Sequence, residues 1–119
     1  MRTDIKLLFK SYESQFDPAT LAWAMRVHHR ICAKLPLTWA RKGTWIEAWN
    51  GKRRIAFAPH QSGCSIYFQG SVAIDRYRDL GGCCPAGRVS IHIPLDAEFE
   101  DRLLVRIVVE YLHLNNRLS

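Results

Sequence analysis

The dipeptide Asn50-Gly51 lies between two segments with alternating apolar side chains, and this pattern constrains the fold most strongly. In residues 44–49 and again in residues 52–58, apolar side chains recur at every second position, as in half-buried strands. Asn-Gly is typical of a type I′ turn, whose two central residues both need a positive φ. We therefore expect a β-hairpin over residues 44–58, with its turn at this dipeptide.

Two further segments have the same two-residue period. Residues 64–68 alternate between apolar and polar side chains, and residues 88–93 do so again. In the second of these segments three residues are expected to point inward, namely Val89, Ile91 and Ile93. Residues 59–63 begin with proline and end with glycine, so we expect a loop there. The short connections favour antiparallel pairing, and the sequence therefore predicts a four-stranded antiparallel sheet.

Four segments are expected to be helical: residues 4–16, 17–35, 72–80 and 98–114. The second begins most clearly, because Asp17 suits the N-cap and Pro18 the first helical position. Ser71 is expected to cap the third helix. The fourth has acidic residues in its expected first turn, where the helix dipole favours negative charge, and an apolar stripe that ends at Leu114.

The order of elements is therefore α-α-β-β-β-α-β-α, which is typical of an α+β domain with helices mainly on one face of the sheet. The length of 119 residues and the apolar content of 48% fit a single domain over residues 1–119. Residues 1–16 are expected to be an N-terminal helical extension, and residues 17–114 the core. No apolar run approaches the ~18 residues of a membrane span. We expect a cytoplasmic protein that is a monomer or a homodimer.

Basic residues outnumber acidic residues by 17 to 11, which gives a formal net charge of +6. The excess is concentrated in residues 26–54, where Glu47 is the one acidic residue. Two explanations stay open. The basic, aromatic segment 41–54 binds nucleic acid or another anionic macromolecule, or the charges form a solvated face that keeps the domain soluble.

The four cysteines do not have the spacing of a zinc knuckle or of a secreted disulfide framework, so we expect reduced thiols. An alternative is a soft-metal or redox site formed by Cys83 and Cys84 with His60 or His92. His28 lies on the apolar stripe of the second helix. We expect its ring to be partly buried and hydrogen-bonded.

The sequence contains no nucleophile elbow, phosphate-binding loop, dinucleotide fingerprint or metalloprotease motif. We therefore expect a non-enzymatic binding domain for a small ligand or a metal ion, without an assigned catalytic residue. Aromatic residues at alternating strand positions, with arginines beside them, suit a planar or anionic ligand. The candidate binding residues on the sheet are Trp45, Trp49, Arg53, Arg54, Tyr67 and His92. Two alternatives are that the tryptophans face the core, or that they stack on the bases of a single strand.

Several of these motifs, in this order, resemble the YdhG-like domain of unknown function, a bacterial family. The resemblance covers roughly residues 20 to 113, and the residues that carry it are Gly51-Lys52, Ile66-Tyr67-Phe68, Ala73-Ile74, Gly87 and Ile93-Pro94-Leu95-Asp96, followed by Leu103, Leu104, Ile107 and Val108. It implies a compact α+β domain with an antiparallel sheet. Some members are described as frataxin-like intracellular iron chaperones, so the resemblance also implies iron as a ligand. Such a role would need a ridge of carboxylates, and the first two helices here carry only Asp4, Glu13 and Asp17.

Overall fold

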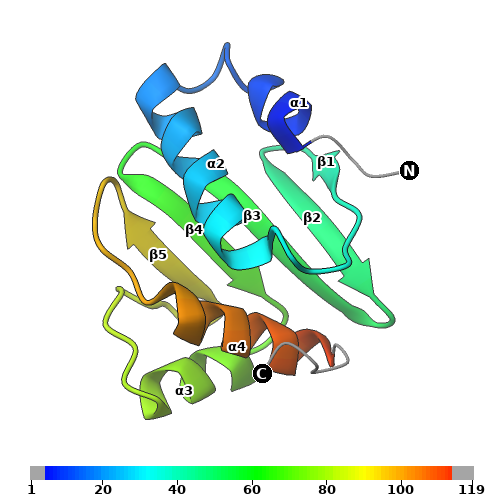
Figure 1. The fold of residues 1–119 in the computed structure, drawn as a ribbon, viewed down its shortest axis with the longest axis vertical. Helices are drawn as coiled ribbons and strands as arrows, with labels where there is room; N and C mark the ends of the chain where they lie inside the picture. Colours follow the sequence, from blue (N-terminus) through cyan, green and yellow to red (C-terminus); the bar gives the residue numbers. More distant parts are fainter. Residues whose placement is uncertain (1–4, 114–119) are drawn as a thin grey trace.

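The computed structural model describes residues 5–113, which form four helices and five strands (Figure 1). In chain order these elements are α1 (Ile5–Lys10), α2 (Pro18–Cys32), β1 (Ala40–Lys42), β2 (Trp45–Asn50), β3 (Arg53–His60), β4 (Gly63–Phe68), α3 (Val72–Asp79), β5 (Ser90–Pro94) and α4 (Asp101–Leu112). The expected α+β class and the antiparallel sheet are confirmed. Within the described part, no helix is both long and apolar enough to cross a membrane.

The sheet has five strands in the order β1-β2-β3-β4-β5, all antiparallel, where the sequence predicted four. The additional strand is β1, which pairs with β2 through Ala40↔Glu47 and Lys42↔Trp45. All three residues of β1 are exposed. A strand that buries no side chain produces no apolar alternation, and this explains why the sequence did not reveal it.

The hairpin between β2 and β3 is confirmed, but its turn differs from the one predicted. Asn50 pairs with Arg53, so the two central residues are Gly51 and Lys52. Gly51 has a φ of 61°, whereas Lys52 is not among the residues with positive φ. The turn is therefore not of type I′, which needs two such residues, and it begins one residue later than Asn50-Gly51 suggested.

The expectation of a loop over residues 59–63 is wrong. Strand β3 continues through Pro59 to His60, and β4 begins at Gly63, which leaves a turn of two residues. Gly63 follows this turn with a φ of 152°, a conformation that other residues rarely adopt. A Cβ at this position would lie 2.1 Å from the carbonyl oxygen of Ile93. Glycine is thus required where β4 begins beside Ile93 and Pro94 of β5.

Helix α2 begins as predicted. Asp17 is its N-cap and accepts a hydrogen bond of 2.8 Å from the backbone N–H of Thr20, and Pro18 is the first helical residue. The helix ends at Cys32 rather than Leu35. Leu35 is nevertheless 3% exposed, because the chain after α2 turns back onto the core.

Helices α1 and α4 are shorter than predicted. Helix α1 ends at Lys10, but the N-terminal segment contributes fully buried side chains at Phe9 and Tyr12, so it belongs to the same core. Helix α4 begins at Asp101, which leaves Glu98 and Glu100 outside its first turn. The expected ends at Asp4 and Leu114 lie outside the described residues.

Helix α3 and strand β5 also differ in detail from the expectations. Ser71 precedes α3, but its side chain makes no capping hydrogen bond. Val89 lies before the first residue of β5 and is 37% exposed, so the expectation that it points inward is wrong. Ile91 and Ile93 are fully buried, as predicted.

Helices α2 and α4 pack on one face of the sheet, which we call the helix face, and α3 packs on α4 (Figure 1). The core lies between them. Its largest fully buried side chains are Tyr12, Tyr77, Phe9, Phe57, Ile46, Ile55, Ile66, Ile74, Ile91, Ile93, Leu104 and Ile107. We call the other side of the sheet the open face.

The two edges of the sheet are short or covered. Strand β1 forms one edge and has three residues, two of them charged. At the other edge, Ala86 bridges to Ile91, and the backbone N–H of His92 donates to the carbonyl of Pro85 at 2.8 Å. The segment before β5 therefore folds back along the outer side of that strand.

Candidate functional site

The open face carries the exposed aromatic residues. Because side chains alternate along a strand, Trp45, Glu47 and Trp49 of β2 point away from the buried Ile46 and Ala48. Trp45 is 37% exposed, Trp49 52% and Tyr67 of β4 40%. The alternative in which the tryptophans form the core face of the sheet is therefore wrong.

A buried carboxylate lies among these aromatic side chains. Glu47 is 4% exposed although it points to the open face. The indole Nε1 of Trp45 donates a hydrogen bond of 2.9 Å to Glu47 Oε2, and Arg54 Nη1 lies 3.6 Å from the same oxygen. The Arg54 guanidinium also lies over the Trp49 ring, at 5.1 Å from its centroid. Glu47 thereby fixes Trp45 and balances the charge of Arg54.

Trp45 and Tyr67 form the two sides of a slot. Their ring centroids are 6.5 Å apart and the rings are tilted by 38°. Between them lies Ala56, which is opposite Tyr67 in the β3–β4 register and whose small side chain leaves room above the sheet. The hollow has a volume of about 260 Å³ and is bordered by Arg54 and Gln69 at its polar end.

A second hollow of about 390 Å³ lies on the other side of the same two rings. His60 and Ser65 line it together with Trp45 and Tyr67. His92 lies behind Ser65, with its Nδ1 3.2 Å from Ser65 Oγ. Its Nε2 lies 3.1 Å from the hydroxyl of Ser62, which is also 3.0 Å from His60 Nδ1. The open face thus has a polar row of imidazoles and hydroxyls beside its aromatic slot.

Five of the six predicted binding residues share the open face, and Arg53 does not. Arg53 projects to the helix face, where its guanidinium lies 5.4 Å from the centroid of the Tyr111 ring. Arg41 does not lie on the open face either. Its guanidinium lies 4.2 Å from the centroid of the Tyr12 ring and donates a hydrogen bond to the carbonyl of Ser11. The cations of segment 41–54 are therefore divided between the two faces.

The candidate metal ligands belong to two separate clusters. His60 lies on the open face, where its ring centroid is 5.4 Å from that of His92. Cys84 instead lies beside α3, where its backbone N–H donates to the hydroxyl of Tyr77, and the backbone N–H of Cys83 donates to Glu100. Burial raises the pKa of the Cys84 thiol, which disfavours the thiolate that binds metals. In residues 5–113 no three His, Cys, Asp or Glu side chains are placed to hold a metal ion.

Three residues of the site were not identified from the sequence: Glu47, Ala56 and Gln69. Glu47 alternates with the tryptophans along the chain, but a lone acid on an alternating strand does not reveal its burial. Gln69 follows β4, and its side-chain oxygen accepts from the backbone N–H of Arg54 at 2.8 Å. One sequence signal indicates the hollows: the small side chains of Ala56 and Ala58 at alternate positions of β3.

Comparison of the chain with protein-family models, with curated proteins and with solved structures found no match. The resemblance to the YdhG-like domain therefore stays a prediction.

Proposed function

We propose that this protein is a non-enzymatic binding domain that takes a flat aromatic molecule between Trp45 and Tyr67. The slot itself supports the proposal most directly. Two exposed rings are held 6.5 Å apart over an alanine, so a planar ring that enters has an aromatic surface on each side. A ring stacked on both faces needs roughly 3.5 Å on each side, about 7 Å in all, so Trp45 and Tyr67 must move slightly apart and become more nearly parallel to accept it.

The groups at the ends of the slot suit a heterocycle with polar atoms on its edge. Arg54 supplies guanidinium donors at one end, and Gln69 supplies an amide. His60 and Ser65 lie at the opposite end. Because Glu47 already balances the charge of Arg54, we expect a neutral or weakly charged ligand rather than one with several phosphates.

Calorimetric titration of the whole protein with adenosine, AMP and a thymidine oligonucleotide tests the proposal. Adenosine is expected to bind, and Trp45→Ala or Tyr67→Ala is expected to weaken binding by about tenfold or more, since stacking on a base contributes ~1–3 kcal/mol. Trp49→Ala is the matched control, because Trp49 lies on the same face but does not line the slot. It is expected to change the affinity by less than about threefold.

The same titration tests the nucleic-acid alternative. Binding through phosphates falls steeply with salt, because each contact releases counterions. If only the oligonucleotide binds, and its affinity falls by about 10³ between 50 and 200 mM salt, the alternative is correct and the slot proposal is wrong. If none of the three compounds binds, or if Trp45→Ala binds as the unchanged protein does, the slot proposal is also wrong.

A further inference from the structure

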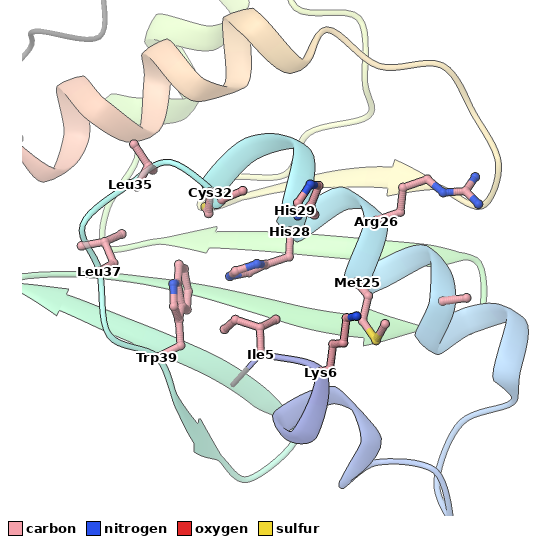
Figure 2. A pocket seen from close by; sticks show the side chains of 12 residues that line it. Ile5, Lys6, Met25, Arg26, His28, His29, Cys32, Leu35, Leu37 and Trp39 are labelled. Carbon is pink, nitrogen blue, oxygen red and sulfur yellow. The ribbon is translucent and has the colours of Figure 1, made fainter. Parts of the chain in front are cut away.

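The helix side of the molecule contains a second, separate cavity. It has a volume of about 560 Å³, within the range of small-molecule sites, and lies between α1, α2 and the segment that leads into β1 (Figure 2). Its lining is mainly apolar, with Ile5, Met25, Leu37 and Trp39 among the residues, and it also includes the basic residues Lys6 and Arg26. None of these residues belongs to the open face, so a ligand in this cavity is independent of the proposed function.

His28 of α2 lines this cavity, and Figure 2 shows its ring extending from the helix toward Trp39. The residue is 3% exposed. Aromatic rings surround it edge-on, with centroid distances of 4.5 Å to Trp39, 4.9 Å to Phe57 and 5.8 Å to Phe9. The imidazole is thus packed among three aromatic rings.

The Nε2 atom of His28 is buried and has no hydrogen-bond partner among residues 5–113. Buried polar atoms in native proteins are nearly always hydrogen-bonded, and each exception calls for an explanation. The expectation of a hydrogen-bonded His28 is therefore wrong for this nitrogen. A phenylalanine or leucine at the same position of the apolar stripe would avoid the free-energy cost of burying a polar atom without a partner. Nε2 has almost no accessible surface, so a ligand in the cavity reaches it only after a small movement of the ring or of the residues around it.

We propose that this cavity binds a compact apolar molecule that carries one hydroxyl group, with the hydroxyl hydrogen-bonded to Nε2 of His28. A hydroxyl both donates and accepts, so it suits either neutral tautomer of the ring. A carboxylate is the competing polar group, because Lys6 and Arg26 also line the cavity, but it requires that Nε2 carry the proton. Burial lowers the pKa of His28 to about 3, with a smaller contribution from His29, so the ring is uncharged at neutral pH.

The experiment compares cyclooctanol with cyclooctane in an NMR titration of the whole protein, with ¹⁵N detection of the His28 ring. These probes are aliphatic, so neither one suits the flat slot of the open face. Cyclooctanol is expected to bind about three- to tenfold more tightly than cyclooctane, the ratio that one neutral hydrogen bond supplies, and to shift the Nε2 resonance. Equal affinities, or no shift of the Nε2 resonance, would overturn the proposal.

Three variants sharpen the test. His28→Phe keeps an apolar ring but lacks the nitrogen, and it is expected to bind both probes equally. Leu37→Trp keeps His28 but fills the cavity, and it is expected to bind neither probe. Its unchanged binding would contradict the proposal even if His28→Phe did not fold. Trp45→Ala, on the open face, is expected to retain the preference for cyclooctanol, and a loss there would place the ligand on the wrong side of the sheet.

Discussion

Acid destabilisation through His28 is the sharpest consequence of the structure for stability. Burial among Phe9, Trp39 and Phe57 holds the pKa of this histidine at about 3, whereas a histidine in the unfolded chain titrates near its ordinary value of 6.5. Between these two values the unfolded state binds a proton that the folded state does not bind. The free energy of unfolding therefore rises with pH between about 3 and 6.5, and it decreases as the pH falls through the same range.

The size of the effect follows from the two pKa values. At pH 7 about one quarter of the unfolded chains are protonated at this position, and at pH 5 almost all of them are. The linkage relation then gives a loss of about 2 kcal/mol between pH 7 and pH 5. For a domain of this size a urea m-value of ~1–3 kcal/mol/M converts this loss into a fall of roughly 1 M in the unfolding midpoint.

Urea titrations followed by tryptophan fluorescence at pH 7, 6 and 5 measure this change. The control is His28→Phe, which keeps every other titratable group, including Asp17 and Glu110, whose pKa values hydrogen bonds lower. The midpoint of the unchanged protein is expected to fall by roughly 1 M more than that of the variant. Equal shifts in the two proteins would show that the buried imidazole does not set the acid limit, and would refute the reasoning.

Three other predictions concern stability. Glu47→Gln removes the negative charge beneath Trp45 and is expected to cost about 1 kcal/mol, which is a fall of about 4 °C in Tm by calorimetry; an unchanged Tm would contradict the role of the carboxylate. Asp17→Ala removes the N-cap of α2 and is expected to cost about 1 kcal/mol in urea, whereas Asp17→Asn, which keeps the acceptor, is expected to cost much less. Gly63→Ala places a Cβ 2.1 Å from the carbonyl oxygen of Ile93 and is expected to cost more than ~2 kcal/mol, while Gly43→Ala, with nothing within 4 Å of the added atom, is expected to cost about 1 kcal/mol.

The sequence predicted those elements in which apolar residues recur with the period of a helix or of a strand. Helix α2 was predicted because its cap and apolar stripe agree, and the β2–β3 hairpin because both strands alternate on the helix face. Strand β1 was missed, since its three exposed residues are held by backbone pairing alone. The end of β3 was missed because Pro59 suggested that the strand stops before it. In the structure Pro59 is buried within the strand.

The candidate site was predictable in outline only. Alternation assigned Trp45, Trp49 and Tyr67 to strand faces, but it did not determine whether those faces were covered, because coverage depends on where α2 and α4 pack. The same limit applies to charge. Arg53 and Arg54 are adjacent in sequence, so they project to opposite faces, and the basic segment does not form one surface.

The placement of His28 was predictable, and its missing partner was not. Its position on the apolar stripe of α2 indicated burial, which the structure confirms. Whether a buried ring nitrogen meets an acceptor depends on Phe9, Trp39 and Phe57, which come from three distant parts of the chain. No local pattern encodes such a combination.

The form of the two sheet edges has a consequence for behaviour at high concentration. A long, bare border strand is a template on which a second molecule adds its own strand, and such growth leads to fibres. Here one border, β1, has three residues and carries Arg41 and Lys42, and the other is lined by the chain's own Pro85–Ala86 segment. A protein built this way is protected from the addition of strands at either border of its sheet.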